Sequence, residues 1–164
     1  MRIFIFITAL LFLVALDIAS KWWVVSSFQP HVPYFIFPWL NIHLTFNTGA
    51  AFSMLSHSGP WKFLIFGASA AILFLLLLKE NIQRPSKINL ITSSLIVGGA
   101  IGNGIDRLVS GKVVDFISVH YQSWYFAIFN FADIYITLGS CLWILDQLFR
   151  NNQSKKPQES DLPQ

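Results

Sequence analysis

The amino-acid sequence predicts an all-α polytopic membrane protein with four transmembrane helices. Only 12% of its 164 residues are charged and 54% are hydrophobic, whereas a soluble domain carries about 25% charged residues. The mean hydropathy is +0.57, and the apolar residues gather in four long blocks, which argues against a soluble enzyme. The net charge of +3 does not indicate nucleic-acid binding, because the basic residues are scattered instead of clustered on one face.

The first span is expected at about residues 3–25. This block carries no charge apart from Asp17 and Lys21, and about 20 residues of helix cross the hydrocarbon core of a bilayer. A cleaved signal peptide is the alternative, since Arg2 precedes the apolar run. No clear cleavage site follows, and the Trp22–Trp23 pair is typical of an anchor at the membrane interface.

Three further spans are expected at about residues 62–79, 88–106 and 129–149. Basic residues concentrate in the cytoplasmic loops of membrane proteins. With a cytoplasmic N-terminus, seven of the eleven basic residues lie inside: Arg2, Lys79, Arg84, Lys87, Arg150, Lys155 and Lys156. Both termini are therefore expected in the cytoplasm. Residues 1–150 form one membrane-embedded domain in this interpretation, and the polar residues 151–164 form a disordered tail.

An outer platform is expected between the first two spans, at about residues 26–59. No Asp, Glu, Lys or Arg occurs in it. In residues 40–46, apolar side chains alternate with Asn, His and Thr, and this period of two predicts a half-buried strand. Prolines keep the preceding residues out of a helix. The uncharged, aromatic surface indicates either contact with lipid or an apolar substrate or packing against the helix ends.

Polar and ionisable residues gather at the expected outer ends of the third and fourth spans, namely Asn103, Asp106, Arg107, Asp115, Asn130 and Asp133. Such groups near a bilayer are costly and usually functional or paired. If Asp115 and Asp133 face one another, one carboxyl keeps its proton and the pair supplies a general acid and a general base. Such a pair is able to activate water against an amide without a metal or cofactor. A network of salt bridges and helix caps is the alternative interpretation.

Competing chemistries have weaker support. No HExxH motif occurs, and the four histidines, His31, His43, His57 and His120, lack the spacing of metal ligands. The pairs Gly98/Gly102 and Ala100/Gly104 match the small-xxx-small pattern of closely packed membrane helices. No metal site and no cofactor are therefore expected.

Five sequence blocks together resemble a known family. They are Asp-Ile-Ala-Ser-Lys (17–21), Phe-Asn-Thr-Gly-Ala-Ala-Phe-Ser (46–53), Gly-Gly-Ala-Ile-Gly-Asn-Gly-Ile-Asp-Arg (98–107), Val-Val-Asp-Phe-Ile (113–117) and Phe-Asn-Phe-Ala-Asp (129–133). Their order and content resemble the signature of lipoprotein signal peptidase, the bacterial signal peptidase II. The similarity covers about residues 1–150. Two departures are a missing proline at Ala127 or Ile128, and Gly104 where a larger residue is more usual.

The resemblance implies four membrane helices with a small extracytoplasmic β-cradle in the bacterial inner membrane. It implies an aspartyl endopeptidase that removes the signal peptide from diacylglyceryl-modified prolipoproteins, cutting before the lipidated Cys, and we expect it to act as a monomer. Asp115 and Asp133 match the catalytic dyad of the family. Further matches are substrate-pocket positions (Asn47, Asn103, Arg107 and Asn130) and supporting positions (Asp17, Lys21 and Asp106). The segment 116–126 is expected as a loop, either a lid or an interface anchor.

Two other classes are compatible with parts of the sequence. A non-catalytic transporter subunit or assembly factor would use the acids as an ion relay, but a relay distributes them across the membrane, whereas Asp106, Asp115 and Asp133 gather near one face. An intramembrane protease of the presenilin type would contain a G-x-G-D motif. That motif is absent here, because Ile105 separates Gly104 from Asp106.

Overall fold

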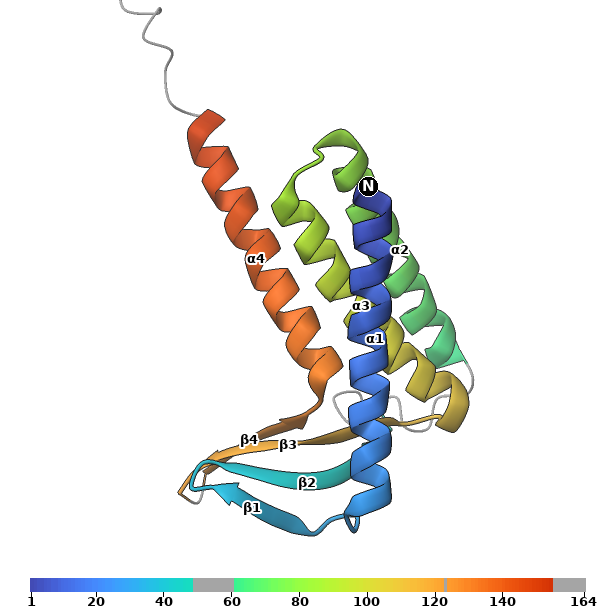
Figure 1. The fold of residues 1–164 in the computed structure, drawn as a ribbon, viewed down its shortest axis with the longest axis vertical. Helices are drawn as coiled ribbons and strands as arrows, with labels where there is room; N and C mark the ends of the chain where they lie inside the picture. Colours follow the sequence, from blue (N-terminus) through green and yellow to red (C-terminus); the bar gives the residue numbers. More distant parts are fainter. Residues whose placement is uncertain (49–60, 123, 155–164) are drawn as a thin grey trace, which may run out of the picture.

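The structure is a computed structural model that describes residues 1–48, 61–122 and 124–154, and it combines a helix bundle with a small sheet (Figure 1). In chain order the elements are α1 (Arg2–Ser27), β1 (Pro33–Phe37), β2 (Leu40–Asn47), α2 (Trp61–Gln83), α3 (Lys87–Ser110), β3 (Val113–Tyr121), β4 (Trp124–Phe129) and α4 (Phe131–Ser154). The sheet lies across one end of the bundle, and the N-terminus lies at the other end.

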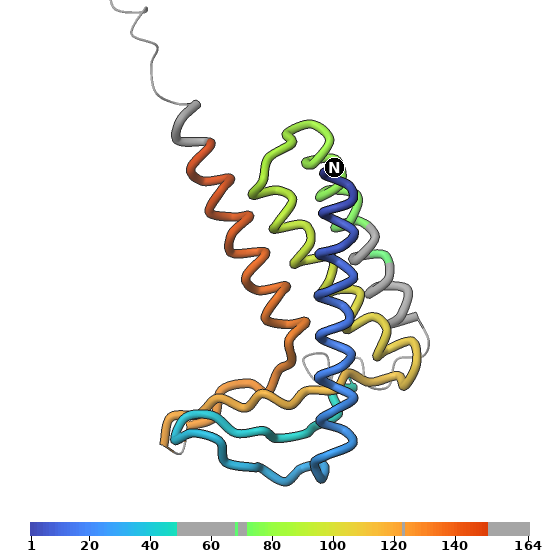
Figure 2. Tube along the Cα trace, viewed as in Figure 1, coloured from blue at the N-terminus to red at the C-terminus, as the bar shows by residue number. Residues whose placement is uncertain are grey.

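The described part of the chain contains four helices of 23 to 26 residues. Helix α3 packs against α1, α2 and α4 (Figure 2). Helices α1 and α3 are long and apolar enough to cross a membrane, and the 26 residues of α1 rise about 39 Å, compared with a hydrocarbon core of about 30 Å. Most apolar side chains of α1 are exposed in the structure, as expected for a helix in contact with lipid. The membrane-spanning role of α2 and α4 stays a prediction.

The sheet has four antiparallel strands in the order β1-β2-β3-β4. The strand that the alternation at residues 40–46 predicts is confirmed as β2. A cluster of buried residues, Val24, Leu44, Val114 and Phe116, joins this sheet to the end of α1. The register of β2 and β3 shifts between Ile42 and Thr45, so that Thr45 pairs with Asp115. The packing thus fixes the central strand β3 against the helices.

The prediction of a loop at residues 116–126 is wrong. This segment forms most of the hairpin of β3 and β4. Tyr121 and Trp124 are the last pair of residues that face one another across its two strands. Val113 to Phe116 are all buried, because β3 is covered on both faces. A strand covered on both faces shows no clean alternation of apolar and polar residues, and the sequence pattern therefore did not reveal it.

The boundaries of the fourth span also differ from the expectation. Phe129 ends β4, and α4 begins at Phe131 instead of residue 129. Helix α4 continues to Ser154, so that residues 151–154 of the expected tail are helical. The remaining tail, residues 155–164, and residues 49–60, which include the end of the expected outer platform, lie outside the described residues.

Candidate active site

Asp115 and Asp133 lie where the sheet meets the helix bundle. Asp115 is in the central strand β3, and Asp133 is in the first turn of α4. The carboxyl group of Asp115 belongs to a residue that is only 3% exposed, whereas Asp133 is half-buried. A carboxylate in the first turn of a helix is stabilised by the positive end of the helix dipole.

Asn130 connects these two acids. Its Nδ2 donates to Asp115 Oδ1 at 2.7 Å, and its Oδ1 accepts from the backbone N–H of Asp133 at 3.0 Å. In return, Asp133 Oδ2 accepts from the backbone N–H of Asn130 at 3.2 Å. This reciprocal arrangement is that of a capping box at the start of a helix. The cap of α4 therefore also sets the distance and orientation of Asp133 relative to Asp115.

Two further amides complete the contacts of the acid pair. Asn47 Nδ2 donates to Asp115 Oδ2 at 2.9 Å, and Asn103 Nδ2 donates to Asp133 Oδ1 at 2.8 Å. Asn103 Oδ1 also accepts from Asn130 Nδ2 at 3.2 Å. Each carboxyl oxygen of the pair thus accepts a hydrogen bond from a side-chain amide or from the backbone: β2 and α3 contribute one each, and Asn130 contributes two.

Lys21 lies behind the amides with its charge buried. Its Nζ lies 2.7 Å from Asp17 Oδ2 and 3.0 Å from Asp106 Oδ2, and it donates to Asn103 Oδ1 at 3.0 Å. An ammonium group has three N–H donors, and these three acceptors match them in number. Since Asn103 in turn holds Asp133, Lys21 orients the acid pair indirectly.

The two acidic partners of Lys21 tie neighbouring elements to it through the backbone. Asp17 Oδ1 accepts from the N–H of Ala132 in α4 at 3.0 Å, and Asp106 Oδ2 accepts from the N–H of Val114 in β3 at 3.1 Å. Sequence patterns do not reveal Ala132 or Val114 in these roles, because any residue except proline offers the same backbone donor. The group of Asp17, Lys21 and Asp106 thus holds α1, α3, β3 and α4 in one arrangement.

The environment of Asp115 favours its protonated form. Burial raises the pKa of this carboxyl above its ordinary value, and the nearby charge of Asp133 acts in the same direction. The hydrogen bonds from Asn47 and Asn130 and the charge of Lys21 oppose the shift without cancelling it. A carboxyl group with a raised pKa beside a second acid is the arrangement that general acid–base chemistry needs.

The structure brings together nearly all of the residues that the sequence singled out. Arg107 Nη1 donates to the carbonyl oxygen of Asn103, four residues earlier in α3, at 3.2 Å. Within residues 1–48, 61–122 and 124–154, no three His, Cys, Asp or Glu side chains are grouped in a way that could hold a metal ion. His57 lies outside these residues.

Two solved structures share the fold, and both are described as bacterial membrane enzymes. One has a TM-score of 0.77 at 32% identity and covers 87% of this chain and 92% of its own. The other has a TM-score of 0.78 at 30% identity and covers 94% and 93%. The fold and the paired acids therefore define a membrane enzyme.

The family model for signal peptidase (SPase) II matches residues 9–149. Among curated relatives, the lipoprotein signal peptidase of Neisseria gonorrhoeae is 39% identical and covers 87% of this chain and 88% of its own. The lipoprotein signal peptidase of Polynucleobacter necessarius is 40% identical over 81% and 82% of the two chains. This chain belongs to the signal peptidase II family and is a bacterial membrane peptidase.

Proposed function

We propose that this chain is an aspartyl endopeptidase that removes the signal peptide from diacylglyceryl-modified prolipoproteins, cutting just before the lipidated Cys. The observation that carries the proposal is the convergence of Asp115 and Asp133 on one asparagine, Asn130. The relatives named lipoprotein signal peptidase support the choice of substrate.

In the proposed reaction, Asp133 accepts a proton from a water molecule as the water oxygen attacks the scissile carbonyl carbon. Asp115 holds a proton at the start, as the raised pKa of its carboxyl favours, and donates it to the carbonyl oxygen. Asp133 then returns its proton to the leaving nitrogen as the C–N bond breaks, and Asp115 regains a proton from the diol. Both acids finish in their starting protonation states, as a general acid and base must.

The remaining polar residues of the site would position the substrate and the acids. Asn47, Asn103 and Asn130 donate to the acid pair, and together with Arg107 they are the proposed lining of the substrate pocket. Asp17, Lys21 and Asp106 would support them from behind. No step in this scheme requires a metal or a cofactor, since the two carboxyls supply both proton transfers.

The surroundings of the site suit a lipidated substrate. Exposed aromatic side chains lie on the sheet and in the turn between β1 and β2, among them Phe35, Trp39, Trp124 and Phe126. Aromatic residues are enriched at the membrane interface, and burial of an acyl chain contributes about 0.8 kcal/mol per CH₂. We propose that all four helices span the inner membrane, with both termini in the cytoplasm and the site at the outer face, and that the enzyme acts as a monomer.

Processing of a prolipoprotein with and without its diacylglyceryl group tests this function. The purified wild type is expected to cleave only the lipidated form, and Asp115→Asn and Asp133→Asn are expected to lose at least about a thousandfold in rate, because each removes one of the two proton transfers. Asp146→Asn is the matched control, since this acid pairs with Arg150 in α4, away from the sheet. Substantial processing by either dyad variant would remove that residue from the mechanism.

A further inference from the structure

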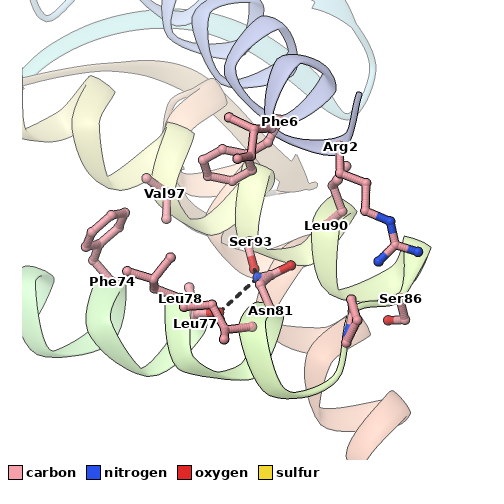
Figure 3. A pocket seen from close by; sticks show the side chains of 13 residues that line it. Arg2, Phe6, Phe74, Leu77, Leu78, Asn81, Ser86, Leu90, Ser93 and Val97 are labelled. Atoms are coloured by element: carbon pink, nitrogen blue, oxygen red, sulfur yellow. Dashed lines mark hydrogen bonds between the residues drawn. The ribbon is translucent and has the colours of Figure 1, made fainter.

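An apolar cavity of about 430 Å³ lies between α1, α2 and α3, at the end of the bundle away from the sheet. Its walls include Phe6 of α1, Leu77 and Leu78 of α2, and Leu90 of α3. Figure 3 shows Arg2 and Ser86 at one end of this cavity and Phe74 and Val97 at the other. None of the residues of the proposed active site lines this cavity, and the proposed reaction does not use it.

Two uncharged polar side chains of the cavity wall, Asn81 and Ser93, are engaged with the protein. Asn81 Nδ2 donates to the carbonyl oxygen of Leu77 at 2.9 Å and to Ser93 Oγ. The amide N–H donors of Asn81 are therefore used within the protein and are not offered to a polar ligand. What remains exposed to the cavity is predominantly hydrocarbon, which suits an apolar occupant.

A second cavity of about 290 Å³ continues the first along α3, and the two share Phe74 and Val97 as lining residues. Together they extend from Ser86 to Ile101, a rise of about 22 Å along the helix axis. Half of a hydrocarbon core is about 15 Å thick. The groove formed by both cavities, the α3 groove, therefore reaches through at least one leaflet of a bilayer.

The size of the α3 groove selects the kind of occupant. A helix about 10 Å across has a volume of more than about 1,500 Å³ over the same length. The two cavities offer about 430 and 290 Å³, which accommodates an extended acyl chain, whereas a helix would lie largely outside them.

The rim of the groove is basic. Arg2 lines it, and Arg84 and Lys87 flank the lining residues Pro85 and Ser86 in the chain. All three basic side chains are exposed. The nearby acid, Glu80, accepts a hydrogen bond from Gln147 of α4 at 3.3 Å. Basic pockets between transmembrane helices on the cytoplasmic side are suited to the headgroups of anionic lipids.

We propose that the α3 groove binds an anionic glycerophospholipid of the cytoplasmic leaflet, with its phosphate at Arg2 and one acyl chain between α1 and α2. The assignment to this leaflet rests on the proposed orientation of the chain, whereas the binding itself does not depend on the proposed peptidase activity. The lipid would fill the space between α1 and α2, which pack on α3 from either side. It would thereby hold the cytoplasmic ends of the three helices together.

Native mass spectrometry of the purified full chain, titrated with phosphatidylglycerol or phosphatidylcholine of identical acyl chains, tests the proposal. The wild type is expected to bind one phosphatidylglycerol at least several-fold more tightly. Arg2→Gln should weaken phosphatidylglycerol binding about fivefold, which corresponds to about 1 kcal/mol per basic residue. Lys79→Gln is the matched control, since Lys79 is also exposed but does not line the groove, and it should keep the wild-type affinity.

A second pair of variants tests the groove itself. Leu78→Trp places a larger side chain in the cavity and is expected to weaken binding of both lipids at least tenfold. Leu76→Trp changes an exposed residue of the same helix that does not line the groove and should bind as the wild type does. Equal affinity for the two lipids, equal behaviour of the two tryptophan variants, or occupancy of the groove by a second copy would overturn the proposal. The inactive Asp115→Asn should still bind phosphatidylglycerol, which separates this outcome from a failure of the proposed function.

Discussion

At the scale of single residues, the most informative side chain is Asn130. It is fully buried, its oxygen accepts from Asp133 N–H, and its nitrogen donates to Asp115 Oδ1. Only a side chain with both a donor and an acceptor satisfies both contacts, which excludes Asp and Ala as equivalents. The helix cap and the geometry of the acid pair therefore depend on the same amide.

Replacement of this amide should affect activity more than stability. We expect Asn130→Ala to lower the free energy of unfolding by about 1 to 2 kcal/mol, the usual effect of losing a helix cap, and to reduce kcat at least about a hundredfold because Asp133 loses its orientation. Ser86→Ala removes the cap of α3, where Ser86 Oγ accepts from Asn89 N–H at 3.0 Å. It should cost similar stability with a far smaller loss of kcat. Similar losses of kcat in both variants would contradict a positioning role for Asn130.

The buried carboxyl of Asp115 should also make stability depend on pH. Its pKa is raised in the folded state because of burial, so the folded state binds this proton more tightly than the unfolded state does. The stabilisation is therefore complete below about pH 4, near the ordinary pKa of Asp, and it is lost as pH rises through the raised pKa. Thermal unfolding in detergent should show the Tm of the wild type falling relative to that of Asp115→Asn between these limits. A difference in Tm that is constant with pH would contradict this expectation.

The sequence was sufficient to name the acids but not to describe how they are held. Asp115 and Asp133 stand out because ionisable residues are rare in so apolar a chain. The spacing of residues does not reveal that Asp17 binds Ala132 N–H or that Asn103 bridges Lys21 and Asp133. These contacts join residues 30 to 115 positions apart, and only the packing of the helices brings them together.

At the scale of elements, α3 is the helix against which the others pack, and its glycines determine how closely they approach. A Cβ at Gly102 would meet the carboxylate of Asp17 in α1, and one at Gly99 would meet the backbone oxygen of Ala132 in α4. The predicted close packing at Gly102 is thus confirmed, whereas a Cβ at Gly104 would meet no atom of the described residues within 4 Å. Helix α3 therefore packs closely against α1 at Gly102 and against α4 at Gly99, next to the acid site.

Alanine substitution should change the stability of the protein differently at Gly99 and at Gly104. We expect Gly99→Ala to destabilise the protein by about 1 to 3 kcal/mol, because the backbone of α4 must move away. Gly104→Ala should have no such cost and should stabilise α3 by up to about 1 kcal/mol through the higher helix propensity of Ala. Thermal unfolding of both variants in the same detergent measures the difference. Equal destabilisation would show that α3 and α4 do not meet at Gly99.

The elements differ in how far their sequence predicts them. Helices α1 and α3 follow from long, predominantly apolar runs, and β2 from its alternation at residues 40–46. The hairpin of β3 and β4 was not predicted, because Val113 to Phe116 are all buried and β4 carries mostly apolar residues on both faces. Since Asp115 lies within that hairpin, its rigid placement in a central strand is also something that the sequence did not reveal.

At the scale of the whole molecule, the two ends of the bundle have different chemistry. The sheet end carries the acid pair and exposed aromatic residues, whereas the other end carries the α3 groove with its basic rim. The concentration of basic residues in cytoplasmic loops of membrane proteins predicts that the end with the groove faces the cytoplasm. The proposed peptidase site and the proposed lipid site would then lie in opposite leaflets, so that a substrate in the outer leaflet does not compete with the inner lipid.

Labelling with a membrane-impermeant maleimide tests this orientation. Cys141 is the single native cysteine, so Cys141→Ser gives a background without thiols. Gln29→Cys lies in the exposed turn after α1 and Gln83→Cys at the exposed end of α2, and the two differ only in place. Because the proposed topology puts the first outside and the second inside, intact spheroplasts should label only Gln29→Cys, and permeabilised cells should label both. Labelling of Gln83→Cys alone in intact spheroplasts would show that the chain has the opposite orientation. The acid pair would then lie at the cytoplasmic face, out of reach of a substrate anchored in the outer leaflet.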